Sequence, residues 1–151
     1  MEARMQHPAM IVPGAMEALQ AVGKSVYASG LDRNLIELVN LRASQINGCS
    51  VCVEMHARSL RKNGESDERL FAVAAWREAP YFSDSERAAL ALTEALTRIA
   101  DRPDPVPDDV YAEARRHFDE PELASLILAI ANINVWNRLN VATRQIAGRI
   151  R

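Results

Sequence analysis

The middle of the chain contains the segment ELVNLRASQINGCSVCVEMH, residues 37–56. Its apolar residues recur at helical spacing and predict a helix that Gly48 ends, because a glycine commonly follows the last turn of a helix. A second helix is predicted to begin directly after this glycine, with Cys49, Cys52 and His56 spaced three and four residues apart. Residues at this spacing project from one face of a helix. We therefore expect both thiols and the imidazole on the same side.

The chain has 151 residues and only these two cysteines. Cα atoms three residues apart in a helix are separated by about 5 Å, which lies within the range that a disulfide tolerates. The spacing therefore allows Cys49 and Cys52 to form a disulfide. Glu37 lies about three turns before the end of the preceding helix. If the two helices fold back antiparallel through the glycine turn, we expect its carboxylate to lie beside His56.

A thiol pair with a neighbouring acid and base indicates thiol redox catalysis. A free cysteine has a pKa near 8.5 and is only about 3% ionised at pH 7. A helix N-terminus and an imidazolium could give roughly 25-fold more thiolate, but the accompanying loss of nucleophilicity removes about tenfold of that gain. A positioned general acid contributes about 10² to 10⁴. We therefore expect Glu37 and His56 to protonate the leaving group, while the second cysteine captures the sulfenic acid as a disulfide.

The rest of the chain also has a helical pattern, without sustained alternation of β-branched and polar residues. The predicted helices run from Pro13-Gly14 to Ser29-Gly30, from Asp32 to Gly48, from Cys49 or Ser50 to Gly64, from Ser66 to Pro80, from Ser83 to Asp101, from Pro107 onward, and from Asp119 onward. The proline-rich loop at 102–107 is too short to separate two domains. We predict one all-α domain over residues 1–151, a helical bundle.

The last predicted helix is apolar on nearly every side between Leu123 and Trp136. A helix of this kind is normally buried at the centre of a bundle or against another subunit. Three asparagines accompany the tryptophan, at Asn134, Asn137 and Asn140. We interpret them as amides that satisfy buried backbone beside a core tryptophan, or as a subunit contact.

The composition excludes several function classes. Hydrophobic residues make up 48% of the chain, charged residues 25%, and the formal net charge is -2. A chain without a basic excess is not expected to bind nucleic acid. The N-terminus lacks the apolar region of a secretory signal, and the most apolar run, at 126–131, is too short to span a membrane. We expect a cytoplasmic protein, where a C-x-x-C pair indicates metal binding or catalysis more than a structural disulfide.

The pattern of Glu37, Cys49, Cys52 and His56 resembles the core of the AhpD-like alkylhydroperoxidases, within the carboxymuconolactone decarboxylase superfamily. The pattern of that family is a glutamate, twelve residues to the first cysteine, and then C-x-x-C-x-x-x-H, and all four positions match. The resemblance implies an all-α, AhpD-like helical bundle that forms a homo-oligomer, either a trimer or a hexamer. It also implies the reduction of organic hydroperoxides, with recycling by a separate dithiol donor of the lipoyl or thioredoxin type.

The resemblance also assigns roles. It makes Cys52 the thiol that attacks peroxide, Cys49 the resolving thiol, and Glu37 with His56 the proton relay, with no cofactor beyond the redox-active disulfide. Position argues partly the other way, because Cys49 is nearer the helix N-terminus and is more exposed to the helix dipole. The best-known AhpD members carry a second histidine just before the second cysteine, where this chain has Val51.

Three other hypotheses use the same residues. A decarboxylase or lactone-processing enzyme of the superfamily would use Glu37, His56 and an arginine, with incidental thiols. A redox sensor or scaffold would change its assembly when the disulfide forms. A structural zinc site would take Cys49, Cys52, His56 and Glu37, although the last two ligands have unusual spacing and no second C-x-x-C follows.

Other polar residues have simpler interpretations. Arg42 and Ser44 share a predicted helix with the glutamate and could orient it, and neither is expected to be catalytic. His117 is expected to interact with a helix C-terminal dipole, whereas His7 lies in a terminus that we expect to be frayed. The charged run at 58–69 is expected to be a solvated surface.

Overall fold

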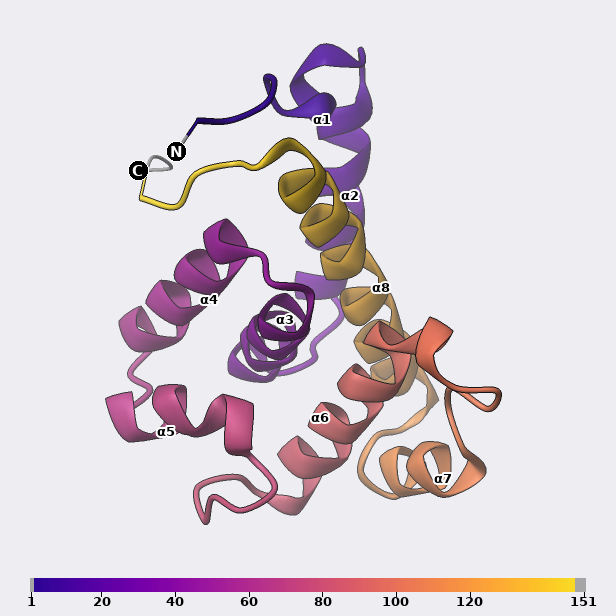
Figure 1. Ribbon diagram of the computed structural model, residues 1–151. Coiled ribbons are helices and arrows are strands. Elements are labelled where there is room, and N and C mark those ends of the chain that lie inside the picture. Colours follow the sequence, from indigo (N-terminus) through magenta and orange to yellow (C-terminus); the bar gives the residue numbers. More distant parts are fainter. Residues whose placement is uncertain (1, 149–151) are drawn as a thin grey trace.

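The computed structural model describes residues 2–148, and every regular element in that span is a helix (Figure 1). The α-helices are α1 (Pro8–Ile11), α2 (Ala15–Tyr27), α3 (Arg33–Asn47), α4 (Ser50–Lys62), α5 (Asp67–Ala72), α6 (Asp84–Thr97), α7 (Asp108–His117) and α8 (Glu120–Thr143). Two short 3₁₀ helices, Val73–Ala75 and Ile99–Asp101, follow α5 and α6. The all-α prediction is therefore confirmed over the described residues.

Helix α3 forms the centre of the bundle, and α4, α6 and α8 pack around it (Figure 1). Its residues from Leu35 to Leu41 are all buried, including Glu37 and Asn40. The sequence predicted the last helix to be buried at the centre of the bundle or against another subunit, and the first option is only partly right. Helix α8 buries one side but leaves Leu128 and Val135 more than 40% exposed. The polar residues of α3 make it look amphipathic in sequence, although they are buried with their apolar neighbours.

The predicted helix starts agree with the observed caps. Asp32 accepts the backbone N–H of Leu35 at 2.8 Å, and Ser83 and Asp119 each form a capping box, which satisfies N–H groups that the first turn leaves free. Pro107 is the cap of α7 instead of its first residue. Among residues 2–148, no helix is long and apolar enough to cross a membrane.

Several helix boundaries differ from the prediction. The helix expected to reach Pro80 ends at Ala72 and continues as one 3₁₀ turn. The helix expected to reach Asp101 ends at Thr97 in the same way. Helix α1 was not predicted at all, because four residues are too few to show a period. His7 caps this helix through its Nδ1, at 3.2 Å from the N–H of Ala9, so the expectation of a frayed terminus at this position was wrong.

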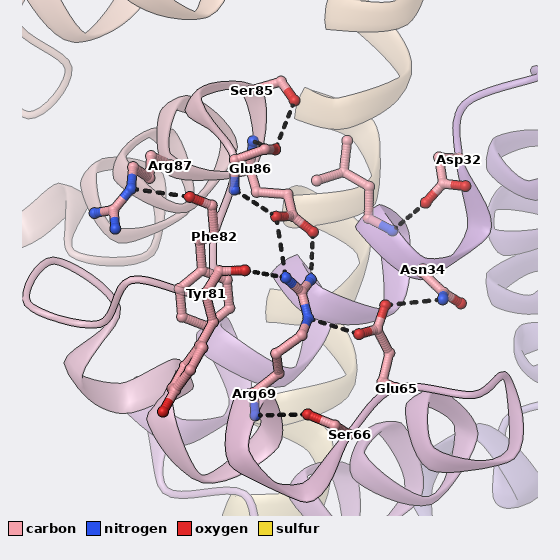
Figure 2. A network of polar contacts seen from close by, with 12 residues as sticks. Asp32, Asn34, Glu65, Ser66, Arg69, Tyr81, Phe82, Ser85, Glu86 and Arg87 are labelled. Atoms are coloured by element: carbon pink, nitrogen blue, oxygen red, sulfur yellow. Dashed lines mark hydrogen bonds and ion pairs between the residues drawn. The ribbon is translucent and has the colours of Figure 1, made fainter.

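One charged cluster is also more ordered than the sequence suggested. The guanidinium of Arg69 is half-buried between Glu65 and Glu86, at 2.6 Å and 2.5 Å, and also donates to the carbonyl of Tyr81 (Figure 2). Glu65 accepts in turn from Asn34 of α3 at 3.0 Å. These contacts connect α3, α5 and α6 across separate parts of the chain. The solvated-surface interpretation therefore fails at Arg69 and Glu65.

Candidate active site

A tight turn at Gly48 joins α3 to α4. Gly48 has φ 68°, in the left-handed region that glycine adopts without steric penalty. The N–H of Cys49 donates to the carbonyl of Ser44 at 3.0 Å, which closes the end of α3. The chain reverses at this point, so α3 and α4 lie side by side, as the sequence predicted.

The turn places the two cysteines at the start of α4. Cys49 is the cap of this helix, and its sulfur accepts the backbone N–H of Cys52 at 3.3 Å. The two sulfurs form a disulfide with a Cα–Cα distance of 5.4 Å, and both residues are buried. The distance agrees with the helical spacing from which the bridge was predicted. The disulfide packs in a small apolar cluster with Ala43, Val51 and Ile133.

His56 lies one turn further along α4 and forms a buried pair with Glu37 of α3. The Nδ1 of His56 lies 2.7 Å from Oε2 of Glu37, and both side chains are more than 90% buried. The predicted contact between the carboxylate and the imidazole is therefore confirmed. The other ring nitrogen, Nε2, is buried and has no hydrogen-bond partner among residues 2–148.

A third residue, Tyr27, completes the pair and was missed in the sequence. It is the last residue of α2, and its hydroxyl donates to Oε1 of Glu37 at 2.5 Å. Burial, followed by the hydrogen bond to the Glu37 carboxylate, raises the pKa of Tyr27 above its ordinary value of 10. The phenol therefore remains a hydrogen-bond donor throughout the physiological range.

These contacts keep Glu37 ionised although it is buried. Burial by itself would raise the pKa of this carboxyl, but hydrogen bonds from His56, Tyr27 and Ser59 outweigh it and lower the pKa below 4.5. Near neutral pH the group is therefore a carboxylate, with Oε1 accepting from Tyr27 and Oε2 in contact with Nδ1 of His56. This arrangement fixes the orientation of the His56 ring.

A pocket of about 340 Å³ opens at the disulfide. One wall is the α3–α4 turn at 48–51, and the other is the end of α8 with Asn140, Val141, Arg144 and Gln145. Cys49 lines this pocket, whereas Cys52 does not. Asn140 borders the pocket and also reaches the inner sulfur, with its Nδ2 at 3.4 Å from Sγ of Cys52.

Comparison with known proteins identifies the family. The profile of the Carboxymuconolactone decarboxylase family matches residues 13–95, which include α2, α3, α4 and nearly all of α6. The chain belongs to the carboxymuconolactone decarboxylase family. Its AhpD-like character is supported by a local match to the alkyl hydroperoxide reductase AhpD of Bradyrhizobium diazoefficiens, 42% identical over 41 residues. That match covers 27% of this chain and 22% of the relative.

Two relatives match nearly the whole chain. The uncharacterised protein YdfG of Bacillus subtilis is 39% identical over 132 residues, which are 87% of this chain and 88% of YdfG. The crystal structure of ATU0492 from Agrobacterium tumefaciens superimposes with a TM-score of 0.90 at 38% identity, covering 97% of this chain and 98% of that one. ATU0492 is described as a protein of unknown function, with the name AhpD, an antioxidant defence protein, attached provisionally. The likeness extends over the entire bundle.

In this member of the decarboxylase family, Arg42 and Ser44, which the sequence suggested could orient Glu37, make other contacts. Arg42 donates to Oε1 of Glu94 from Nε at 2.8 Å and from Nη2 at 2.6 Å, because five residues along a helix turn a side chain about 140° away from Glu37. Ser44 donates to the carbonyl of Asn40 at 2.7 Å. Neither residue orients the carboxylate, and that suggestion was wrong.

The asparagines of α8 support the site from the other side. Asn47, at the end of α3, donates to Asn134 and Asn137 of α8, both at 2.9 Å. Asn137 donates to Ser44 at 3.0 Å. The sequence predicted amides that satisfy buried backbone, or a subunit contact. Asn134 does donate to the carbonyl of Ile130 at 2.9 Å, but the α3 contacts of Asn137 and the sulfur contact of Asn140 are with side chains. Together they hold the α3–α4 turn, and with it the disulfide, against α8.

The remaining aromatic and histidine predictions have mixed outcomes. Trp136 is half-buried and packs on the cluster that contains the cysteines, with the ring of His7 at 5.6 Å between centroids. His117 lies in the last turn of α7, where a dipole interaction was expected, and its Nε2 is 3.1 Å from Glu113.

No group of three or more metal-ligating side chains occurs in the part of the chain that the structure describes.

Proposed function

We propose that this protein is a thiol-dependent peroxidase that reduces organic hydroperoxides through the Cys49–Cys52 disulfide, with Glu37 and His56 as the proton relay. The observation that carries the proposal is the disulfide at the N-terminus of α4 with a buried carboxylate–imidazole pair one turn later. Family membership supports the same chemistry, as does the local likeness to an alkyl hydroperoxide reductase.

The reaction begins in the reduced protein. The Cys52 thiolate attacks the distal oxygen of the hydroperoxide, the O–O bond breaks, and the leaving alkoxide takes a proton from the relay to become an alcohol. Cys52 is then a sulfenic acid. The Cys49 thiolate attacks this sulfur and hydroxide leaves, which forms the disulfide after a second proton transfer gives water. His56 is suited to deliver these protons because its Nδ1 is held by Glu37 while its Nε2 has no partner among residues 2–148.

The assignment of Cys52 as the attacking thiol is supported by its surroundings. His56 is four residues further on the same helix, and Asn140 donates toward the Cys52 sulfur. A hydrogen-bond donor aimed at sulfur stabilises a thiolate there. Cys49, in contrast, lines the pocket. This position fits a thiol that exchanges with an external dithiol reductant of the lipoyl or thioredoxin type. Such reductants are maintained in the cytoplasm.

The proposed assembly is a homo-oligomer, a trimer or a hexamer. Helix α8 leaves Leu128 and Val135 more than 40% exposed, and their separation of seven residues places them on one face of the helix. Exposed apolar residues at helical spacing are typical of a face that packs against another subunit. Sedimentation equilibrium of the purified chain tests the stoichiometry.

A decarboxylase of the same family is the second candidate, because the family carries that name. That chemistry was expected to use Glu37, His56 and an arginine. The only arginine predicted near the glutamate, Arg42, is instead held by Glu94. The structure therefore gives the thiol hypothesis more support than this alternative.

The decisive experiment follows peroxide consumption by the reduced protein. Wild type should consume cumene hydroperoxide and gain one intramolecular disulfide, measured by mass spectrometry. Cys52→Ser should stop consumption, whereas Cys49→Ser should leave a sulfenic acid on Cys52 that dimedone traps. A decarboxylase activity that survives alkylation of both thiols would instead favour the decarboxylase. A change of assembly on oxidation without turnover would favour a redox sensor.

A further inference from the structure

The disulfide is almost completely covered by protein. Cys49 is 2% exposed and Cys52 is 1% exposed, so a reagent from solvent reaches these sulfurs only when part of the structure moves. Ala147, which follows the last helix, packs against the apolar cluster that contains both cysteines. Residues 145–148 therefore form part of the cover of the disulfide, and we call them the cover segment.

The cover segment is held by residues 4–7, which we call the strap. Gln145 donates from Nε2 to the carbonyl of Met5 at 3.1 Å. Arg4 donates its backbone N–H at 2.9 Å and a guanidinium N–H at 3.0 Å to the carbonyls of the last two residues of α8, which the helix itself leaves free. The strap and the cover segment thus lie side by side across the end of α8 (Figure 1). Movement of the strap therefore frees the cover segment at Gln145.

His7 fixes the strap where it enters α1. Its Nδ1 accepts the backbone N–H of Ala9 at 3.2 Å, which caps this helix. Its ring lies against Trp136 of α8, with 5.6 Å between the ring centroids. Trp136 in turn packs on the apolar cluster that contains both cysteines. One imidazole therefore connects the strap to α1 and to a residue of α8 beside the disulfide.

These contacts require the neutral form of the imidazole. Nδ1 of His7 accepts through its lone pair, so the ring proton is on Nε2. Nε2 is buried and has no hydrogen-bond partner among residues 2–148. A proton added at Nδ1 removes the acceptor of the cap and places a charge in a buried position, which is unfavourable. Burial accordingly lowers the pKa of His7, although the face of a tryptophan ring attracts cations.

No charged side chain compensates for this proton in the described part of the chain. The strap, the residue before it and the neighbouring helices α2 and α8 carry the charged residues Glu2, Arg4, Glu17, Lys24, Glu120, Glu122, Arg138 and, at the cap of α8, Arg144. None of them forms an ion pair with His7. At the other end of the cover segment, the carboxylate of Glu54 accepts the backbone N–H of Gly148 at 2.5 Å. His7 is therefore the titratable group of the strap.

We propose that the strap is a pH-sensitive latch on the disulfide: protonation of His7 releases residues 4–7 and lets the cover segment move away from the two cysteines. The inference goes beyond the redox cycle proposed above, because it concerns only how the disulfide is reached. A histidine that is free of the latch has an ordinary pKa of about 6.5. The closed latch is therefore favoured above this pH. It loses stability as the pH falls below 6.5, because the open form then binds a proton that the closed form binds less readily.

The test measures how fast an uncharged phosphine, tris(hydroxypropyl)phosphine, reduces the disulfide at pH 7.5 and at pH 5. The phosphine attacks one sulfur, the other leaves as a thiolate, and water then releases the first sulfur and the phosphine oxide, so that both cysteines end as thiols. His7→Asn is the reference variant, because an asparagine oxygen also caps a helix and does not titrate. The ratio of the wild-type rate to the His7→Asn rate cancels the pH dependence of the reagent. This ratio should rise at least about threefold from pH 7.5 to pH 5, with an upper limit of about 30-fold set by proton uptake at a pKa of 6.5.

Two further variants and a second measurement complete the design. His7→Ala has no side chain that caps α1, so it should be reduced faster than His7→Asn by the same factor at both pH values. His117→Gln removes the partly buried histidine of α7, whose Nε2 lies 3.1 Å from Glu113, and should keep the wild-type rise. Hydrogen exchange of residues 4–12 follows the strap itself. At pH 5 it should be faster in wild type than in His7→Asn, and the difference should shrink at pH 7.5.

A ratio of wild-type to His7→Asn rates that stays constant between the two pH values would overturn the latch. Loss of the rise in His117→Gln would do the same, as would a rise without faster hydrogen exchange of the strap. The assay contains no peroxide and follows only access to the disulfide. The peroxidase proposal can therefore fail while the latch stands, and the latch can fail while the protein still consumes peroxide.

Discussion

Replacing Tyr27 by phenylalanine tests whether the phenol holds the buried Glu37 carboxylate in place. The change keeps the ring and removes the hydroxyl that donates to Glu37 at 2.5 Å. A hydrogen bond to a charged group contributes about 1.5 to 3 kcal/mol. Because Tyr27 is only half-buried, we expect the lower end of this range, a loss of about 1.5 kcal/mol in the free energy of unfolding at pH 7.

The pH dependence of this loss separates the carboxylate from simple packing. Contacts lower the pKa of Glu37 below 4.5 in the folded protein, so their stabilising effect is fully present above that pH. It disappears as the pH falls through the lower folded pKa, because the carboxyl is then protonated in both states. The difference between wild type and Tyr27→Phe should therefore be largest near neutral pH and should shrink toward pH 3.

The assay is urea denaturation of the oxidised proteins at a series of pH values. Tyr111→Phe is the matched control, since this tyrosine lies on the exposed side of α7 and should change the free energy of unfolding by less than about 0.5 kcal/mol. In the peroxidase assay, Tyr27→Phe should also shift the acid limb of the pH–rate profile to higher pH. Loss of the hydrogen bond raises the pKa of Glu37, so this carboxyl becomes protonated at a higher pH. A loss of stability that is constant from pH 7 to pH 3 would show that the hydroxyl does not act on an ionised Glu37.

Two more predictions concern the neighbours of the site. Glu94→Gln should lower the free energy of unfolding by about 3 kcal/mol in urea denaturation, because it leaves the nearly buried Arg42 without its charge partner. Arg77 is the exposed partner of the same carboxylate, so Arg77→Gln should lower the free energy of unfolding by less than about 1 kcal/mol. Similar losses for both variants would contradict the idea that burial of Arg42 makes its ion pair the more important one. Asn140→Ala should slow iodoacetamide alkylation of reduced Cys52 about threefold, because the amide no longer donates toward the thiolate. Alkylation of Cys49 should be unchanged. Equal slowing at both cysteines would point to a general structural effect.

The parts of the site that the sequence predicted all depend on short spacing. Cys49 and Cys52 are one helical turn apart, and a glycine with positive φ reverses the chain just before them. The pairing of Glu37 with His56 follows once these two helices are antiparallel, because nothing else in the fold is needed to bring them together. Local rules of capping and periodicity are sufficient for such a unit.

The parts that the sequence did not predict depend on contacts between distant segments. Tyr27 reaches Glu37 across the junction of α2 and α3, and Asn140 reaches Cys52 from 88 residues away. A tyrosine at a helix end and an asparagine in an apolar helix carry no periodic signal of such contacts. The placement of α3 at the centre was missed for the same reason, since burial of Glu37 depends on partners that come from other helices.

The position of Cys49 as the cap of α4 explains how the bundle could support a redox cycle with little rearrangement. In the disulfide form the first turn of α4 already directs a backbone N–H at the Cys49 sulfur. When the bridge opens, the same N–H group and the helix dipole are available to a thiolate at that position. The frame around it does not depend on the bridge, because Ser44 holds the backbone of Cys49 and the asparagines of α8 hold the turn. In the cycle proposed above, the redox change would therefore be confined to one helical turn, and the Glu37–His56 pair would stay in place.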